Sequence, residues 1–200
     1  MLMYSCPSGM NTAIPQEYWQ AAEALFPPDG FPKDPDALAS GATGFAEILG
    51  IGSDYRRLLD AGNSSDMRKF FGHFRNNLDL LIQKTWVEKA DETRKYKLQE
   101  RIPSFIRDIE AAEYRKALLK FSSILDELSY LLFGTQSNKE DFIEYALRID
   151  LQMGLFWWYG SQLEQFLSIS SQEATQARQD DVNENCRAIL LIGMCYLTNF

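Results

Sequence analysis

The clearest pattern in the chain is a broad apolar stripe between Ser104 and Phe133. Large apolar or small residues recur there at alternating spacings of three and four, at Tyr114, Ala117, Phe121, Ile124, Leu128 and Leu131. This period is that of an α-helix with one apolar face, and such a helix is stable only when other elements cover that face. The pattern therefore predicts a central helix over 104–133, around which the rest of the chain folds.

Three further long helices are predicted from the same periodicity. The first covers 64–89, and the sequence then turns polar, so that the helix either continues into solvent or breaks near Asp91. Capping-box signatures, in which a serine precedes a glutamate by three residues, predict helix starts at Ser137 and Ser170. The helix that begins at Ser137 extends to Leu167, and the last helix extends to the end of the chain.

Shorter helices are predicted before residue 64, at 16–26, 36–49 and 53–61, where proline and glycine punctuate the chain. No stretch alternates with the period of two that a strand requires. Four long helices in succession with short connections are typical of an antiparallel bundle. The expected fold is therefore all-α: an antiparallel four-helix bundle of long helices with two or three shorter N-terminal helices packed on it.

The expected organisation is a single domain over 15–200, preceded by an N-terminal extension over 1–14 with no fixed structure. Met10 is an alternative start of the chain. An apolar content of 46% is typical of a globular protein, and the longest uncharged apolar run, 188–197, is too short to span a bilayer. Three cysteines without metal-ligand spacing indicate a reduced setting, so a cytoplasmic location is expected.

The net charge of −8 disfavours binding to nucleic acid or to a membrane surface. Residues 66–101 carry a local basic excess, nine Lys/Arg against six Asp/Glu, but the two signs alternate along the segment. Such interleaving is typical of a solvated helix face. Neither nucleic acid nor a membrane is therefore expected as a partner.

The only histidine, His73, follows Arg68 by five residues. A histidine can act as a general base and an arginine can hold a phosphate, so the pair suits phosphodiester cleavage. The spacing resembles the Arg-x(4–6)-His motif of HEPN ribonucleases, which are all-α bundles that pair so that two motifs face one cleft. The resemblance implies a metal-independent ribonuclease with Arg68 and His73 as catalytic residues, and this is the alternative function.

Two pairs of carboxylates, Glu110 with Glu113 and Asp181 with Glu184, each occupy one face of a predicted helix. Pairs of this kind that meet across a bundle can hold Mg²⁺, and they resemble part of the acidic signature of all-α nucleotide pyrophosphohydrolases. A chain with 28 acidic residues produces such pairs by chance, so solvated faces are the preferred interpretation. No metal and no cofactor are expected.

The most distinctive stretch is the aromatic run 156–159, whose four side chains point around more than half of a helix. In one interpretation the N-terminal helices cover its outer rings, which gives those helices a packing surface. In the other, a second apolar stripe binds a partner, because aromatic residues are enriched in interfaces. The residues of this candidate partner-binding stripe are Leu147, Leu151, Leu155 and Trp158.

These patterns contain no complete catalytic or cofactor motif. The expected function is therefore that of a non-catalytic helical-bundle interaction or adaptor protein, with a protein partner or a second copy of the chain bound through the aromatic-rich helix.

Overall fold

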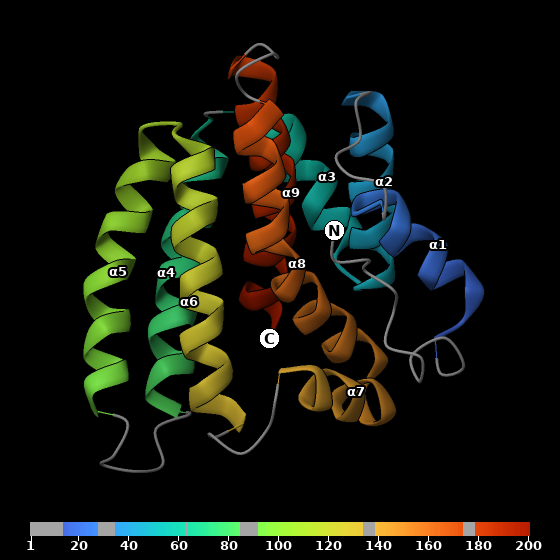
Figure 1. Cartoon of the computed structure of the whole chain (residues 1–200). Coiled ribbons are helices and arrows are strands. Elements are labelled where there is room, and N and C mark those ends of the chain that lie inside the picture. Colours follow the sequence, from blue (N-terminus) through green and yellow to red (C-terminus); the bar gives the residue numbers. More distant parts are fainter. Residues whose placement is uncertain (1–13, 28–34, 63, 85–91, 134–138, 174–178) are drawn as a thin grey trace.

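The computed structural model describes residues 14–27, 35–62, 64–84, 92–133, 139–173 and 179–200, and the fold is described for these ranges (Figure 1). Within them every regular element is a helix, so the predicted all-α class is confirmed. The helices are α1 (Gln16–Leu25), α2 (Pro35–Ile48), α3 (Gly52–Ala61), α4 (Ser65–Lys84), α5 (Glu92–Glu110), α6 (Tyr114–Phe133), α7 (Lys139–Ile149), α8 (Leu151–Glu173) and α9 (Gln179–Asn199).

The helix α9 occupies the middle of the molecule and contacts α2, α3, α4, α6 and α8. Figure 1 shows α4, α5 and α6 on one side of it and α1, α2 and α3 on the other. The helices α6 and α9 can approach each other closely because α9 carries Gly193, where an added Cβ would lie 2.3 Å from the ring of Phe121 on α6. The predicted organising role of 104–133 therefore belongs to α9.

The predicted central helix over 104–133 is divided between α5 and α6. The two helices meet in a turn at residues 111–113, in which Ala112 has a φ of 56°. The buried positions of α5 end at Ile109 and those of α6 begin at Tyr114. On one continuous helix this spacing of five would rotate the next side chain by about 140°, so a single apolar stripe does not join the two segments. Pro103 lies inside α5.

The predicted helix from Ser137 to Leu167 is also divided. It breaks at Asp150, whose carboxylate accepts a hydrogen bond from the Met153 N–H at 3.1 Å and so caps α8. The helix α7 then folds back on α8, and this is possible because an added Cβ on Gly154 would lie 2.6 Å from the backbone nitrogen of Leu147.

The predicted helix start at Ser170 is wrong, because α8 continues to Glu173 and α9 begins at Gln179. Ser137, the region around Asp91 and the predicted extension, apart from Ile14, lie outside the described residues. The three N-terminal helices match their predicted positions to within two residues.

A buried cation joins α9 to α3. The side chain of Arg187 is 10% exposed, and its guanidinium donates hydrogen bonds to the carbonyl oxygens of Leu58 and Leu59 at 3.2 and 3.0 Å. These carbonyls belong to the last turn of α3, where a positive charge is favourable. Arg187 therefore fixes the end of α3 on α9.

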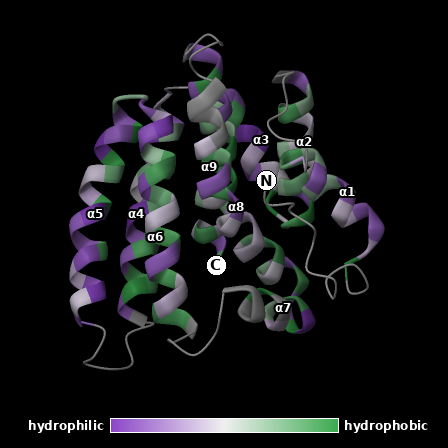
Figure 2. Cartoon of the chain, viewed as in Figure 1, coloured by the Kyte–Doolittle hydropathy of each residue, from purple (hydrophilic) through white to green (hydrophobic). Residues whose placement is uncertain are grey.

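Hydrophilic residues are frequent along α5, which lies at one edge of the molecule (Figure 2). Among the described helices, none combines the length and the apolar content that crossing a bilayer would require.

Candidate functional site

The aromatic run 156–159 lies on α8, and all four of its side chains are buried. Phe156 stacks on Tyr196 of α9 with ring centroids 4.1 Å apart, and it contacts Trp157 edge to face at 5.3 Å. Trp158 and Tyr159 point toward the N-terminal helices. The side chains of the run therefore divide their contacts between α9 and the N-terminal helices, and none of them forms an open surface.

The rings on the N-terminal side form a continuous surface, which we call the aromatic seat: Phe45 of α2 with Trp158, Tyr159 and Phe166 of α8. The ring of Phe45 lies 6.2 Å from that of Trp158 and 6.1 Å from that of Tyr159. Edge-to-face and offset pairs at such distances add to the stability that burial alone gives.

The helix α1 lies on this seat through two aromatic side chains. Trp19 contacts Trp158 edge to face at 5.8 Å. Phe26, directly after α1, contacts Trp158 at 5.8 Å and Phe166 at 5.9 Å. Between these two anchors, Ala22 and Leu25 are fully buried. The α1 segment thus presents one apolar face to the seat.

The backbone of α1 also approaches α2 closely. An added Cβ on Gly41 would lie 2.7 Å from the carbonyl oxygen of Ala24, so only glycine fits at this crossing. One turn further along, an added Cβ on Gly44 would lie 3.8 Å from the Cβ of Ala21, which is ordinary van der Waals contact. Within the described residues, no side chain of α1 makes a hydrogen bond or an ion pair with another helix.

The seat itself is held by the rest of the fold. The hydroxyl of Tyr159 donates a hydrogen bond of 2.7 Å to the carbonyl oxygen of Ile189 on α9. Burial raises the pKa of this phenol well above its usual value, so it remains a neutral donor. Gly160, the next residue, allows α6 to approach, because an added Cβ would lie 3.2 Å from Leu125. These contacts are independent of α1.

The predicted partner-binding residues do not form one open stripe. Leu147 belongs to α7 and packs against Gly154, so it is separated from the other three by the break at Asp150. Leu155 and Trp158 are buried, and Leu151 is half-buried. Trp158 contacts α1 and α2 rather than solvent. Of the two interpretations of the aromatic run, cover by the N-terminal helices is the one that the structure contains.

The residues missing from the predicted site are Trp19 and Phe26, which occupy the seat. A signal for them exists in the sequence. They are spaced by seven, which places two residues on the same side of a helix, and they flank the equally apolar Ala22 and Leu25.

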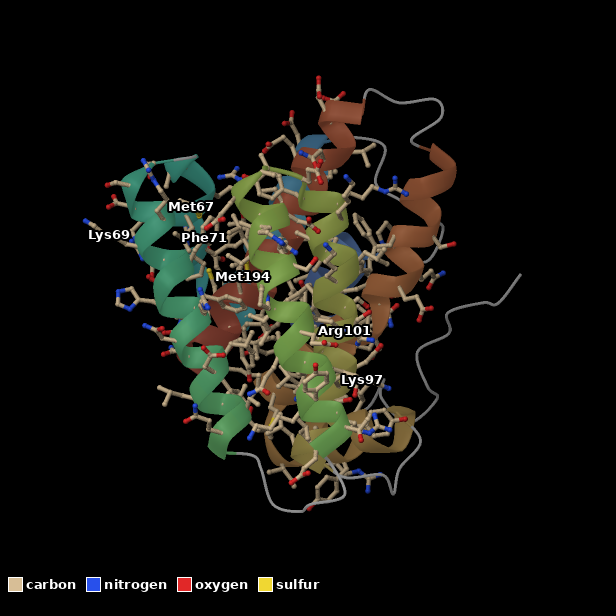
Figure 3. All side chains as sticks on the ribbon, turned by 90° about the vertical axis from the view of Figure 1, so that its left-hand side faces the viewer. Met67, Lys69, Phe71, Lys97, Arg101 and Met194 are labelled. Atoms are coloured by element: carbon tan, nitrogen blue, oxygen red, sulfur yellow. The ribbon has the colours of Figure 1, made fainter. Side chains whose placement is uncertain are left out.

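The candidate catalytic pair, Arg68 and His73, lies on the outer part of α4, and both side chains are exposed. Five residues correspond to a rotation of about 140° around a helix, so the two side chains leave α4 on different sides. Figure 3 shows two other side chains of α4, of which Lys69 points away from α5 and Phe71 points toward it. The ribonuclease hypothesis therefore requires a second chain, and it stays a prediction.

The acidic pairs do not gather around a common centre. Glu113 forms an ion pair with Lys116 at 2.7 Å, and Glu184 forms one with Arg187 at 3.4 Å. Among the described residues, no group of three His, Cys, Asp or Glu side chains is arranged to hold a metal ion. The buried thiols of Cys186 and Cys195 have a pKa raised to about 12, because burial disfavours the thiolate.

Polar side chains link α5 to α6 at the edge of the molecule that lies opposite α1. Glu127 accepts a hydrogen bond from Arg94 at 3.1 Å and forms an ion pair with Arg101 at 3.7 Å. Figure 3 shows Arg101 on α5. The guanidinium of Arg94 also lies over the ring of Tyr130, 3.9 Å from its centre. We call this region the α5–α6 seam.

Comparison of the chain with protein-family models, with curated proteins and with solved structures gives no match.

Proposed function

We propose that this chain is a non-catalytic interaction protein that binds an amphipathic helix on the aromatic seat, and that its own α1 occupies the seat in the free chain. The observation that supports this proposal best is the contact of Trp19 and Phe26 with Trp158, made without a polar side-chain link between α1 and the other described helices. The expected partner is a helix with two large aromatic residues seven positions apart.

The spacing of the anchors supports a helix-in-groove mode of binding. Trp19 lies on α1 and Phe26 follows its last residue, where the Phe26 N–H still donates to the carbonyl oxygen of Ala22 at 3.0 Å. Both rings contact Trp158, so they enter the seat from one face of the α1 segment. Peptide helices that bind proteins in this mode use apolar anchors at spacings of three, four and seven. The seat thus holds α1 in the way that a binding protein holds a helical ligand.

The apolar chemistry of the contact between α1 and the aromatic seat supports the replacement of α1 by a partner helix. A helix that leaves a surface free of polar links does not leave a buried donor or acceptor without a partner, so its removal carries no such penalty. The cost is the exposure of apolar area, and a second helix with similar anchors restores that burial. Any partner helix must nevertheless compete with α1, whose effective concentration at the seat is about millimolar for a short connection.

The seat is preorganised for a ligand. Tyr159 is hydrogen-bonded to α9, Gly160 packs against α6, and Asp150 caps the first turn of α8. A surface that keeps its shape without its ligand loses little conformational freedom when it binds, and this raises affinity.

The proposal is tested with a fluorescent peptide that has the sequence of residues 14–27. The 200-residue chain with Trp19→Ala and Phe26→Ala still carries the seat but has lost both anchors of the internal competitor. We expect this variant to bind the peptide at least about tenfold more tightly than the wild-type chain, measured by fluorescence anisotropy. A peptide in which both anchors are alanine is the matched control, and it should not bind.

A second variant tests the same site from the opposite direction. Ala21→Cys with Gly44→Cys places two thiols at a Cβ separation suited to a disulfide, which holds α1 on α2. Oxidation should abolish peptide binding, and reduction should restore it. If the peptide binds neither the anchor-free chain nor the wild type, while both remain folded by circular dichroism, the seat is simply part of the core.

A further inference from the structure

We infer that the partner helix is the α1 segment of a second copy of this chain, so that two copies associate by reciprocal exchange of α1. This inference rests on the proposed function and names its ligand. The only helix in the described structure that lies on the seat is α1, and it attaches through α2 and through the rings of α8.

A second copy supplies a ligand that is complementary to the seat by construction. Its Trp19 and Phe26 meet the same rings, and its Ala24 meets the same Gly41, at which no side chain would fit. A helix of another protein would have to reproduce both the aromatic spacing and a small residue at this crossing. Exchange of α1 therefore preserves its described contacts with α2 and with the rings of α8.

The charge of the molecule favours an exchange of apolar contacts over association of whole surfaces. The chain carries a net charge of −8, so two copies repel each other at long range. The segment α1 has acidic residues, Glu17 and Glu23, and no basic residue, so charge attraction does not hold it in place. Apolar anchoring is then the principal attraction for α1, whether the seat belongs to its own chain or to another.

Mass action sets the conditions for the exchange. Because the contacts are the same in both forms, the exchanged dimer becomes comparable to the closed monomer when the protein concentration approaches the effective concentration of α1, about millimolar for a short connection. At lower concentrations the dimer is a minor species, and a covalent trap is needed to accumulate it.

The trap uses two separate variants, each with Cys6→Ser to remove the N-terminal thiol. One carries Ala21→Cys and the other carries Gly44→Cys. Neither variant alone can join positions 21 and 44, whose Cβ atoms would lie 3.8 Å apart. In a mixture the two thiols are held together only when α1 of one copy lies on α2 of the other; otherwise they meet only by random collision. We expect oxidation of the mixture to produce a species at twice the mass of 23.0 kDa on a non-reducing denaturing gel.

The matched control is a mixture of Ala21→Cys with Gly72→Cys. Gly72 lies on the exposed side of α4, and an added Cβ would meet no atom within 4 Å, so its thiol reports random collision. The 21–44 mixture should yield at least tenfold more covalent dimer than the 21–72 mixture, and its yield should fall on dilution. Equal yields from the two mixtures overturn the exchange.

The outcomes separate the two proposals. If the peptide of residues 14–27 binds the anchor-free chain but the 21–44 mixture gives no excess of dimer, the exchange is overturned and the helix-binding function remains. If a single chain that carries both Ala21→Cys and Gly44→Cys does not close an intramolecular disulfide, α1 does not occupy the seat, and both proposals are overturned.

Discussion

The helices α1 and α5 both lie at an edge of the fold, and each is attached chiefly to one neighbouring helix, but the attachments differ in kind. The α5–α6 seam contains charged links, in which Glu127 binds Arg94 and Arg101, and Lys120 lies 2.5 Å from Asp108. The contact of α1 with the aromatic seat contains rings and small apolar residues, with no polar side-chain link among the described residues.

This difference concerns specificity more than strength. Partly exposed ion pairs contribute little net stability, about 0–1 kcal/mol each, but they fit only one register of the two helices. An aromatic seat stabilises its ligand through buried area, which another helix with similar anchors can supply. The α5–α6 seam is therefore suited to permanent attachment, and the seat is suited to exchange.

The largest expected effect comes from Trp158→Glu, which places a carboxylate under α1. Trp158 is 9% exposed and contacts Trp19, Phe26 and Phe45, so the charge would have no partner among these rings. We expect a loss of about 4 kcal/mol in the free energy of unfolding, measured with urea. Tyr145→Glu on the exposed face of α7 is the control and should have almost no effect.

Light scattering on the same variant distinguishes core from surface. If Trp158→Glu leaves stability unchanged and converts a dimer into a folded monomer, Trp158 meets another chain directly. The seat would then not be covered by α1, and its contrast with the α5–α6 seam would be wrong.

A smaller and more local effect is expected from Gly41→Ala. Its new Cβ would lie 2.7 Å from the carbonyl oxygen of Ala24, so α1 must move away from α2. We expect a loss of about 2 kcal/mol and faster amide hydrogen exchange in α1, with α5 unchanged. The matched variant Gly44→Ala gains only an ordinary contact with Ala21, and it should leave exchange in α1 unchanged. Equal behaviour of the two variants would show that α1 is not held at this crossing.

The third effect is expected at the opposite edge. Glu127→Gln removes the charge that Arg94 and Arg101 share, and should cost about 1 kcal/mol at low salt and less at high salt. Glu164→Gln, on the exposed side of α8, is the control. The rate of amide hydrogen exchange in α1 should not depend on salt. If salt loosens α1 as much as it loosens α5, charge contributes to both attachments and the comparison fails.

The sequence was a good guide to the N-terminal helices and to the apolar faces, because turn residues and periodicity are local signals. It was a poor guide to continuity. The spacing of five between Ile109 and Tyr114 already interrupts the stripe, and the turn at Ala112 lies within this interval. The break at Asp150 was harder to predict, since Gly154 matters only once α7 folds back and Leu147 packs against it.

The candidate site shows the same division. Aromatic content and burial could be anticipated, but which helix covers Trp158 depends on a long-range crossing at Gly41 that no local pattern defines. The Arg68 and His73 pair shows the converse. Their spacing along the chain matches a known motif, but their side chains leave α4 on different sides.

The smallest effects concern the two phenols at the centre of the molecule. Tyr159→Phe removes the donor that links the seat to Ile189, and we expect a loss of about 1 kcal/mol in the free energy of unfolding. The hydroxyl of Tyr55 is buried without a hydrogen-bond partner among the described residues, so Tyr55→Phe should be neutral or slightly stabilising. Because the Tyr159 link lies beneath the seat, its loss should leave hydrogen exchange in α1 unchanged relative to the rest of the fold. Selective release of α1 in Tyr159→Phe would instead show that the attachment of α1 depends on a polar contact, and would weaken the contrast with the α5–α6 seam.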